Sequence, residues 1–182
     1  MPAASVGNAF AFLVETLFTL YLAALLLRVL LEAVGADYYN PVSQVLLRLT
    51  DPLVAPLGKL IPRLGQINTA AIVLLLVLQT IAVVIVLSLS GYSVQPLQAL
   101  LIAVLRLIRM LLMTWIVLII AEVILSWVGG AMRHPIIPLI YQLTRPILEP
   151  IRRVVPSIAG LDLSPLIAII GLQFLMILIG VR

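Results

Sequence analysis

Long apolar stretches alternate with shorter polar ones along the chain, and four of the apolar stretches are long enough to cross a membrane. They cover residues 10–34, 69–90, 104–128 and 165–181. A helix rises about 1.5 Å per residue, so about 17–25 apolar residues cross a hydrocarbon layer of roughly 30 Å. The pattern predicts an all-α integral membrane protein with four transmembrane helices.

Two connectors, residues 35–68 and 129–164, carry most of the prolines and show apolar positions at helical spacing. These positions are Val42, Val45, Leu46 and Leu49 in the first connector and Ile136, Leu139, Ile140 and Leu143 in the second. Such spacing gives a helix one apolar face. Each connector is predicted to contain two short amphipathic helices, the second beginning near Pro52 or Pro146. We expect them to lie in the membrane interface, with a re-entrant dip as the alternative.

The second half of the chain repeats the first. A gapless shift lays residues 12–88 over 106–182, and every proline of the earlier segment falls on a proline. The matched pairs are Pro41 and Pro135, Pro52 and Pro146, Pro56 and Pro150, and Pro62 and Pro156, and Thr50 falls on Thr144. Proline restricts the backbone, so these matches indicate one duplicated structural unit. Two spans return the chain to its starting side, which predicts two parallel repeats, residues 1–94 and 95–182.

Basic residues collect in the two connectors. They are Arg48, Lys59, Arg63, Arg133, Arg145, Arg152 and Arg153, whereas the first nine residues and the loop 91–103 hold no Lys or Arg. Cytoplasmic loops of membrane proteins are enriched in Lys and Arg. Both connectors are therefore predicted to be cytoplasmic and both termini external, with Lys59, Arg152 and Arg153 at the level of the lipid headgroups.

Charged residues interrupt the first and third spans, and the repeat matches each with the opposite charge. Glu15 falls on Arg109, and Arg28 falls on Glu122. Matched positions lie at the same depth in a parallel repeat, and an unpaired charge within a bilayer is costly. We therefore predict two structural ion pairs, Glu15–Arg109 and Arg28–Glu122, to which a transport pathway is the alternative.

Other polar residues of the spans follow the same repeat. Glu32 and Arg106 could extend the networks of ion pairs. Gln79 falls on Gln173, and we predict that both form hydrogen bonds between helices, with a pore lining as the alternative.

The composition places the chain among membrane proteins and excludes several kinds of chemistry. It is 64% hydrophobic and 10% charged, and it contains no cysteine and one histidine. Disulfides, thiolate catalysis and iron–sulfur clusters are thereby excluded, and we predict no catalytic, cofactor-binding or metal site. His134 falls on Asn40, which predicts a residue at a helix start rather than a proton carrier. The basic residues flank the spans, so no direct nucleic-acid partner is expected, and no cleavable signal peptide is predicted.

Several of these motifs occur together in one known family. They are the duplicated "LTDP" and "LTRP" connectors with their later prolines, "LLLRVLLE" with "NP" soon after it, and "GLDLSP" before the last span. The chain resembles the YggT (YlmG) family of small bacterial and plastid membrane proteins, over nearly its whole length. It departs from the pattern in "INTA" at residues 67–70, where the second half has "LDLS", and at Gly58, which falls on Arg152.

The resemblance implies a protein of the bacterial inner membrane without assigned catalytic or ligand residues. It also implies links to osmotic stress, ion homeostasis, cell division and the biogenesis of membrane complexes and, in plastids, to cytochrome assembly and nucleoid partitioning. We predict a non-enzymatic interaction or assembly factor. Its partners would be the lipid bilayer and other membrane proteins or further copies of the chain. An oligomeric channel-like or transport-modulating protein is the alternative.

Overall fold

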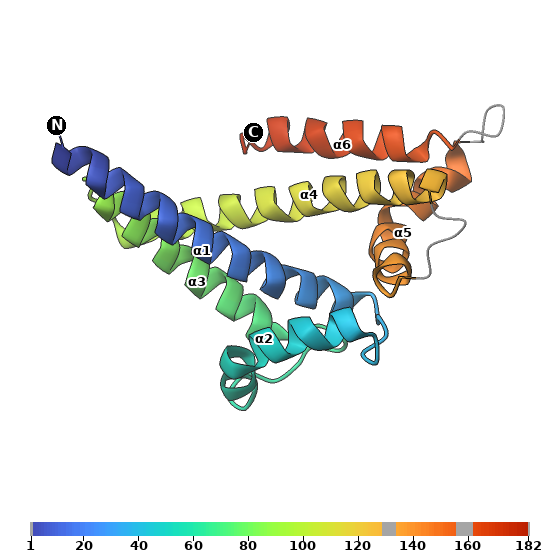
Figure 1. Ribbon diagram of the computed structural model, residues 1–182, viewed down its shortest axis with the longest axis horizontal. Coiled ribbons are helices and arrows are strands. Elements are labelled where there is room, and N and C mark those ends of the chain that lie inside the picture. Colours follow the sequence, from blue (N-terminus) through green and yellow to red (C-terminus); the bar gives the residue numbers. More distant parts are fainter. Residues whose placement is uncertain (1, 129–133, 156–161, 182) are drawn as a thin grey trace. The chain divides into compact units, whose positions relative to one another are not determined.

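The computed structural model describes residues 2–128, 134–155 and 162–181, and over these ranges the regular structure is helical (Figure 1). The helices are α1 Pro2–Ala33, α2 Pro41–Gly58, α3 Thr69–Leu89, α4 Pro96–Val128, α5 Ile136–Val154 and α6 Ser164–Leu178. The expected all-α class is confirmed for the described residues.

Packing divides the chain into two compact units. Unit 1 consists of Met1–Val29 and Leu46–Ile108, and unit 2 consists of Leu30–Val45 and Arg109–Arg182. Each unit therefore takes residues from both halves of the sequence. The repeat boundaries at residues 1–94 and 95–182 stay a prediction, as does the parallel arrangement of the repeats.

Three helices of the described chain are long and apolar enough to cross a membrane. They correspond to Ala9–Ala33, Thr69–Leu89 and Pro96–Trp127. The fourth predicted span contains α6, which is apolar but has only 15 residues. At about 1.5 Å per residue such a helix falls short of roughly 30 Å of hydrocarbon. A fourth span stays a prediction.

Small side chains allow close helix packing in unit 1. Val83 of α3 lies against Ala99 and Ala103 of α4, and all three are fully buried. Small residues let helix backbones approach each other, which compensates for the weak hydrophobic drive to association within lipid. Helix α4 begins at Pro96, earlier than the span predicted from residue 104, because its first turns join this contact.

The connectors begin as the sequence predicts. Pro41 is the first residue of α2, and the N–H of Val42 donates to Oδ1 of Asn40 at 2.9 Å. In the second connector the N–H of Ile136 donates to Nδ1 of His134 at 3.3 Å. The two side chains occupy matched positions and accept from matched backbone donors, so the prediction that His134 marks a helix start is confirmed.

The two short helices expected in each connector are instead one continuous helix. Helix α2 runs through Pro52 and Pro56, and α5 runs through Pro146 and Pro150. Proline removes one helical hydrogen bond and bends the helix without having to end it. In Figure 1 the axes of both helices change direction along their length.

Packing beyond the first internal proline holds each bent helix together. Val54 and Leu148 follow Pro52 and Pro146 at matched positions, and they are 2% and 0% exposed. Because a side chain beyond the proline is buried in each helix, the segment after the proline stays in the helix.

Candidate functional site

A buried arginine joins α1 to α2 in unit 1. Arg28 is 5% exposed, and its Nη1 lies 2.7 Å from Oγ1 of Thr50 and 2.7 Å from Oδ1 of Asp51. Thr50 is fully buried, whereas the side chain of Asp51 is 52% exposed. We call Arg28, Thr50 and Asp51 the first charge cluster.

A buried glutamate joins α4 to α5 in unit 2. Glu122 is 4% exposed, and its carboxylate accepts a hydrogen bond from the hydroxyl of Thr144 and another from Nη2 of Arg152 at 2.9 Å. Nε of Arg152 also donates to Oδ2 of Asp162 at 2.7 Å. We call Glu122, Thr144, Arg152 and Asp162 the second charge cluster.

The two clusters are matched by the repeat but have opposite polarity. Arg28 falls on Glu122 and Thr50 on Thr144. In each cluster the buried charge belongs to a long apolar helix, and the partly exposed counter-charge is supplied by the connector. An unpaired buried charge is strongly destabilising. Each connector helix therefore has to stay in contact with its long apolar helix in order to neutralise the buried charge.

Threonine fits both clusters because its hydroxyl can donate and accept. Thr50 accepts from Arg28 and donates to the carbonyl of Leu46 at 2.6 Å. Thr144 donates to Glu122 and lies 2.9 Å from the carbonyl of Ile140. Bonding to the carbonyl four residues earlier also favours a helix bend, just ahead of the first internal proline.

The counter-charges come from positions that are not matched by the repeat. Asp51 stands beside Thr50, whereas Arg152 falls on Gly58. The repeat departs from its pattern at Gly58 because the second half needs Arg152 at that position to neutralise Glu122. Sequence reasoning assigned Arg152 to the lipid headgroups and gave no role to Asp51 or Asp162.

The ion pairs predicted between the repeats stay predictions, because each would join the two units. Within unit 1, Glu15 pairs with Arg106 at 3.0 Å, and their side chains are 47% and 36% exposed. Arg106 precedes the predicted partner Arg109 by almost one helical turn, and Arg109 is exposed.

The water-accessible face of α5 carries a chain of charges. Glu149 bridges Arg145 at 2.8 Å and Arg153 at 2.9 Å, and both arginine side chains are about three-quarters exposed. A hydrogen bond from Arg145 is the main cause that lowers the pKa of Glu149, and a hydrogen bond to Glu149 raises the pKa of Arg145. Exposed pairs of this kind contribute little to stability, so they define a surface rather than a core.

Hydrogen bonding has a larger effect than burial on the pKa values of Arg152 and Asp162, the partly exposed residues of the second charge cluster. Burial lowers the pKa of Arg152, but its hydrogen bonds to Glu122 and Asp162 have the larger combined effect and raise that pKa. Burial likewise raises the pKa of Asp162, while hydrogen bonds from Arg152 and Ser164 lower it overall. Both groups are therefore held in their charged forms.

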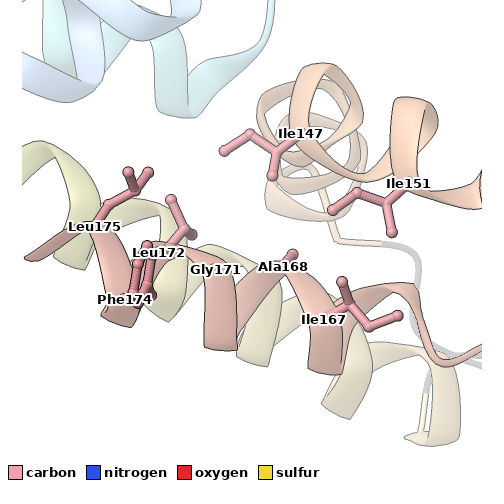
Figure 2. Close-up of a pocket in the computed structure, with 8 residues that line it drawn as sticks. All are labelled: Ile147, Ile151, Ile167, Ala168, Gly171, Leu172, Phe174 and Leu175. Atoms are coloured by element: carbon pink, nitrogen blue, oxygen red, sulfur yellow. The ribbon is translucent and has the colours of Figure 1, made fainter. Parts of the chain in front are cut away.

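The opposite face of α5 meets α6 in an open apolar groove of about 420 Å³. Figure 2 shows Ile147 and Ile151 of α5 above Ile167 and Ala168 of α6. Sites for small molecules of this size usually combine apolar walls with a few orienting polar groups. All the side chains that line this groove are apolar, so the groove suits hydrocarbon and not a polar ligand.

The remaining predicted motif residues lie mostly on the surface. Lys59 and Arg153 are exposed, and so are Pro52, Pro56, Pro62, Pro146 and Pro150. Pro156 lies outside the described residues. In the described part of the chain, no three His, Cys, Asp or Glu side chains are close enough to hold a metal ion.

Long apolar helices together with two bent amphipathic helices, each tied to a buried charge, are typical of a small multi-pass membrane protein. The chain belongs to the YggT family, since the family model described as CCB3/YggT matches residues 7–89 and again 101–181. The two matches fall on the two halves of the duplicated sequence, and they confirm the resemblance drawn from the proline pattern.

Individual relatives extend over nearly the whole chain. A Vibrio alginolyticus protein named "Uncharacterized protein in proC 3'region" is 43% identical over 177 residues, 95% of this chain and 94% of the relative. "Uncharacterized protein YggT" of Escherichia coli strain K12 is 34% identical over 163 residues, 90% of this chain and 85% of the relative. No solved structure matches the chain significantly.

Proposed function

We propose that the chain is a four-span protein of the bacterial inner membrane, with α2 and α5 at the cytoplasmic interface and both termini outside. The basic residues of the connectors support this orientation. Large aromatic side chains near the helix ends support the same interface, because Tyr39 is 88% exposed and Trp127 is 78% exposed. Tyrosine and tryptophan are enriched where hydrocarbon meets water.

The molecular role proposed is that of a non-enzymatic interaction or assembly factor. The observation that carries this proposal is that each connector helix is anchored by a buried charge while part of its surface stays free. In α5, Arg145 and Arg153 face water while Ile147 and Ile151 face α6. A rigid amphipathic helix held at the interface is suited to bind lipid headgroups and a partner membrane protein. The family resemblance favours osmotic or ion homeostasis, or cell division, as the setting.

Site-specific photo-crosslinking in living cells tests this role. A photoreactive residue would replace Arg145, which is exposed, and in a matched control would replace Leu148, which is fully buried on the same helix. We expect a discrete crosslinked protein from position 145 and none from position 148. The same product should decrease when Arg152→Gln releases α5. The absence of a discrete product from position 145, or an unchanged yield in the Arg152→Gln background, would contradict an interaction role.

Transport is the second candidate, and one observation favours it. Glu15 and Arg106 lie in helices of spanning length, yet both are only half-buried. Ionisable residues in such helices often mark ion pathways. Potassium or proton flux into liposomes that contain the purified protein tests this role, with Glu15→Gln as the control. A flux that depends on Glu15 would favour transport, and no flux above that of empty liposomes would favour the interaction role.

A further inference from the structure

The side chain of Asn40 contacts both connectors at once. Its Oδ1 accepts from the N–H of Val42 at the start of α2, and its Nδ2 donates to the carbonyl of Pro135 at 2.7 Å. Pro135 is the residue immediately before α5, so the second bond ties the start of one connector helix to the start of the other. We call Asn40 and Pro135 the connector joint.

The two partners fix the orientation of the Asn40 amide. A backbone N–H donates and a backbone carbonyl accepts, so the amide oxygen faces Val42 and the amide nitrogen faces Pro135. A carbonyl oxygen has two lone pairs, and Pro135 can therefore accept from Asn40 as well as within its own helix. The amide thus serves the cap of α2 and the connector joint at the same time.

The connector joint lies within one packing unit. Unit 2 contains Leu30–Val45 together with Arg109–Arg182, so it holds the start of the first connector and the whole of α5. Asn40 is 9% exposed. A hydrogen bond that is partly shielded from water contributes to stability, and its loss leaves polar groups unsatisfied. The contact between the two connectors is therefore a property of unit 2 by itself.

The repeat gives this contact a particular form. Asn40 falls on His134 and Pro41 falls on Pro135, so exchanging the two halves turns the contact into one between His134 and Pro41. The same two pairs of neighbouring residues are involved, as at the centre of a two-fold contact. In the described part of the chain, His134 bonds to Ile136 and makes no bond to Pro41. The tie between the connector starts thus comes from the Asn40 amide.

We propose that Asn40 couples the two connectors, so that the position of α5 depends on the first connector. Hydrogen bonds between packed elements carry energetic coupling from one element to another. Through the connector joint, a partner that moves α5 also moves the start of α2. A change in the first connector reaches, in turn, the face of α5 that carries Arg145 and Arg153.

The coupling and its consequence have different foundations. The coupling follows from the contact within unit 2, whereas its effect on a bound partner rests on the proposed interaction role. The proposal also requires that both connectors start on the same side of the membrane, as their basic residues predict.

Distances between spin labels test the connector joint, because the chain has no cysteine of its own. Val45→Cys in α2 and Tyr141→Cys in α5 place one label on each connector, at unit 2 positions that are 64% and 40% exposed. We expect one narrow distance distribution for the purified protein in liposomes. Asn40→Asp keeps an oxygen for the cap but loses the donor to Pro135. It should raise the population with separated connectors about two- to tenfold.

Two further variants separate coupling from local helix stability. Gln44→Glu makes the same change from amide to acid one turn along α2, where the side chain bonds to the carbonyl of Tyr39 in the same connector at 3.4 Å. It should leave the distance distribution unchanged. Asn40→Ala removes both bonds, so it should widen the distribution and also speed hydrogen exchange at the Val42 amide. Asn40→Asp should keep that amide protected.

Three results would overturn the proposal. An unchanged narrow distribution in Asn40→Asp would show that the amide does not hold the connectors together. A broad distribution in the parent protein would show that the connector starts are not joined. The third result is a photo-crosslink from position 145 that is undiminished in Asn40→Asp although the distribution widens, because α5 would then keep its position without the first connector.

Failure of the proposed function gives a different pattern. A distribution that widens in Asn40→Asp, together with no crosslinked partner even in the parent protein, would support the connector joint and contradict the interaction role.

Discussion

At the scale of single residues, both charge clusters have a threonine at the same position of the repeat. This threonine contacts a buried cation in unit 1 and a buried anion in unit 2. Thr50 and Thr144 are both fully buried. Asparagine or aspartate at these positions would favour one polarity or compete with the backbone in a helix interior. A hydroxyl accepts from Arg28 and donates to Glu122 without a change of shape, so the helix geometry survives the reversal of charge.

Removal of Arg152 should destabilise unit 2. Arg152→Gln leaves the Glu122 carboxylate buried, with the Thr144 hydroxyl as its remaining partner in the second charge cluster. The loss of a partner to a buried charge costs about 3–5 kcal/mol when both groups are buried. Arg152 is 43% exposed, so we expect about 1–3 kcal/mol, as for an unsatisfied polar group. Thermal unfolding in detergent measures the change.

A second substitution checks the cause of this loss. Glu122→Gln in the Arg152→Gln background removes the buried charge and should recover part of the lost stability. If the double variant is as unstable as the sum of the two single variants, the pair makes no coupled contribution.

Charge-reversal variants can show whether Asp51 or Glu122 is the acid that pairs with Arg28. Arg28→Glu should be harmful because it buries an acid beside Asp51. If the contact within unit 1 dominates, adding Asp51→Arg should restore accumulation and thermal stability, with a coupling of about 0.5–3 kcal/mol. If the pair predicted between the repeats dominates, Glu122→Arg should give the larger rescue. Comparison of the two double variants in one membrane preparation decides between them.

The stabilising effect of Asp162 should disappear in acid. Its pKa is lowered from an ordinary value of 3.8, so the folded state binds its proton less readily than the unfolded state. The contribution is therefore complete above that value and is lost as the pH falls through the lower folded pKa. Asp162 is 42% exposed, and screening by solvent limits the effect to at most ~1 kcal/mol. Thermal unfolding of Asp162→Asn and the parent chain should differ at pH 7 and converge as the pH falls below 3.8 and through the lower folded pKa.

At the scale of elements, the internal prolines bend the connector helices and do not end them. Each bend lies between two anchored segments, and the second segment of α5 carries Arg152 to Glu122. A straight helix would send this segment in another direction. The proline therefore contributes to neutralising the buried charge, because the bend that it causes directs the second segment of the helix toward that charge.

Pro146→Ala should alter the interaction of α5 more than its stability. Alanine supplies the missing backbone donor and is a better helix former, so membrane insertion should be normal and the helix should straighten. We expect fewer crosslinks from position 145 and a weaker Arg152–Glu122 contact, with little change in the amount of protein. Pro52→Ala is the matched change in α2. Unchanged crosslinking in the double variant would mean that the bend is not required.

At the scale of the whole molecule, the proposed topology gives an accessibility pattern that single cysteines can test. Tyr39 and Leu60 are 88% and 80% exposed in the connector that should face the cytoplasm, and Tyr92 is 68% exposed in a loop that should face outward. Ser43, although also in the connector, is 4% exposed and unsuitable for labelling.

Membrane-impermeant thiol reagents applied to intact cells should label Tyr92→Cys and spare Tyr39→Cys and Leu60→Cys. All three should be labelled after the membrane is permeabilised, which controls for folding around each thiol. Labelling of position 39 or 60 from outside would reverse the proposed orientation.

The sequence by itself determined the features that depend on local composition and period. Apolar length predicts the helices α1, α3 and α4, and the matched prolines predict the duplication that the family model also reports. Asn40 as a helix cap and His134 as a residue at a helix start were predictable because each side chain accepts from a backbone donor only two residues away.

Only the tertiary structure decided which groups meet. The sequence shows that Arg28 and Glu122 need counter-charges, but it does not show that Asp51 and Arg152 supply them. Several charges lie within reach along the chain, and the direction of a bent helix selects among them. The continuity of α2 and α5 was decided in the same way. Proline weakens a helix by an amount that the burial of Val54 and Leu148 on the far side of the bend can offset.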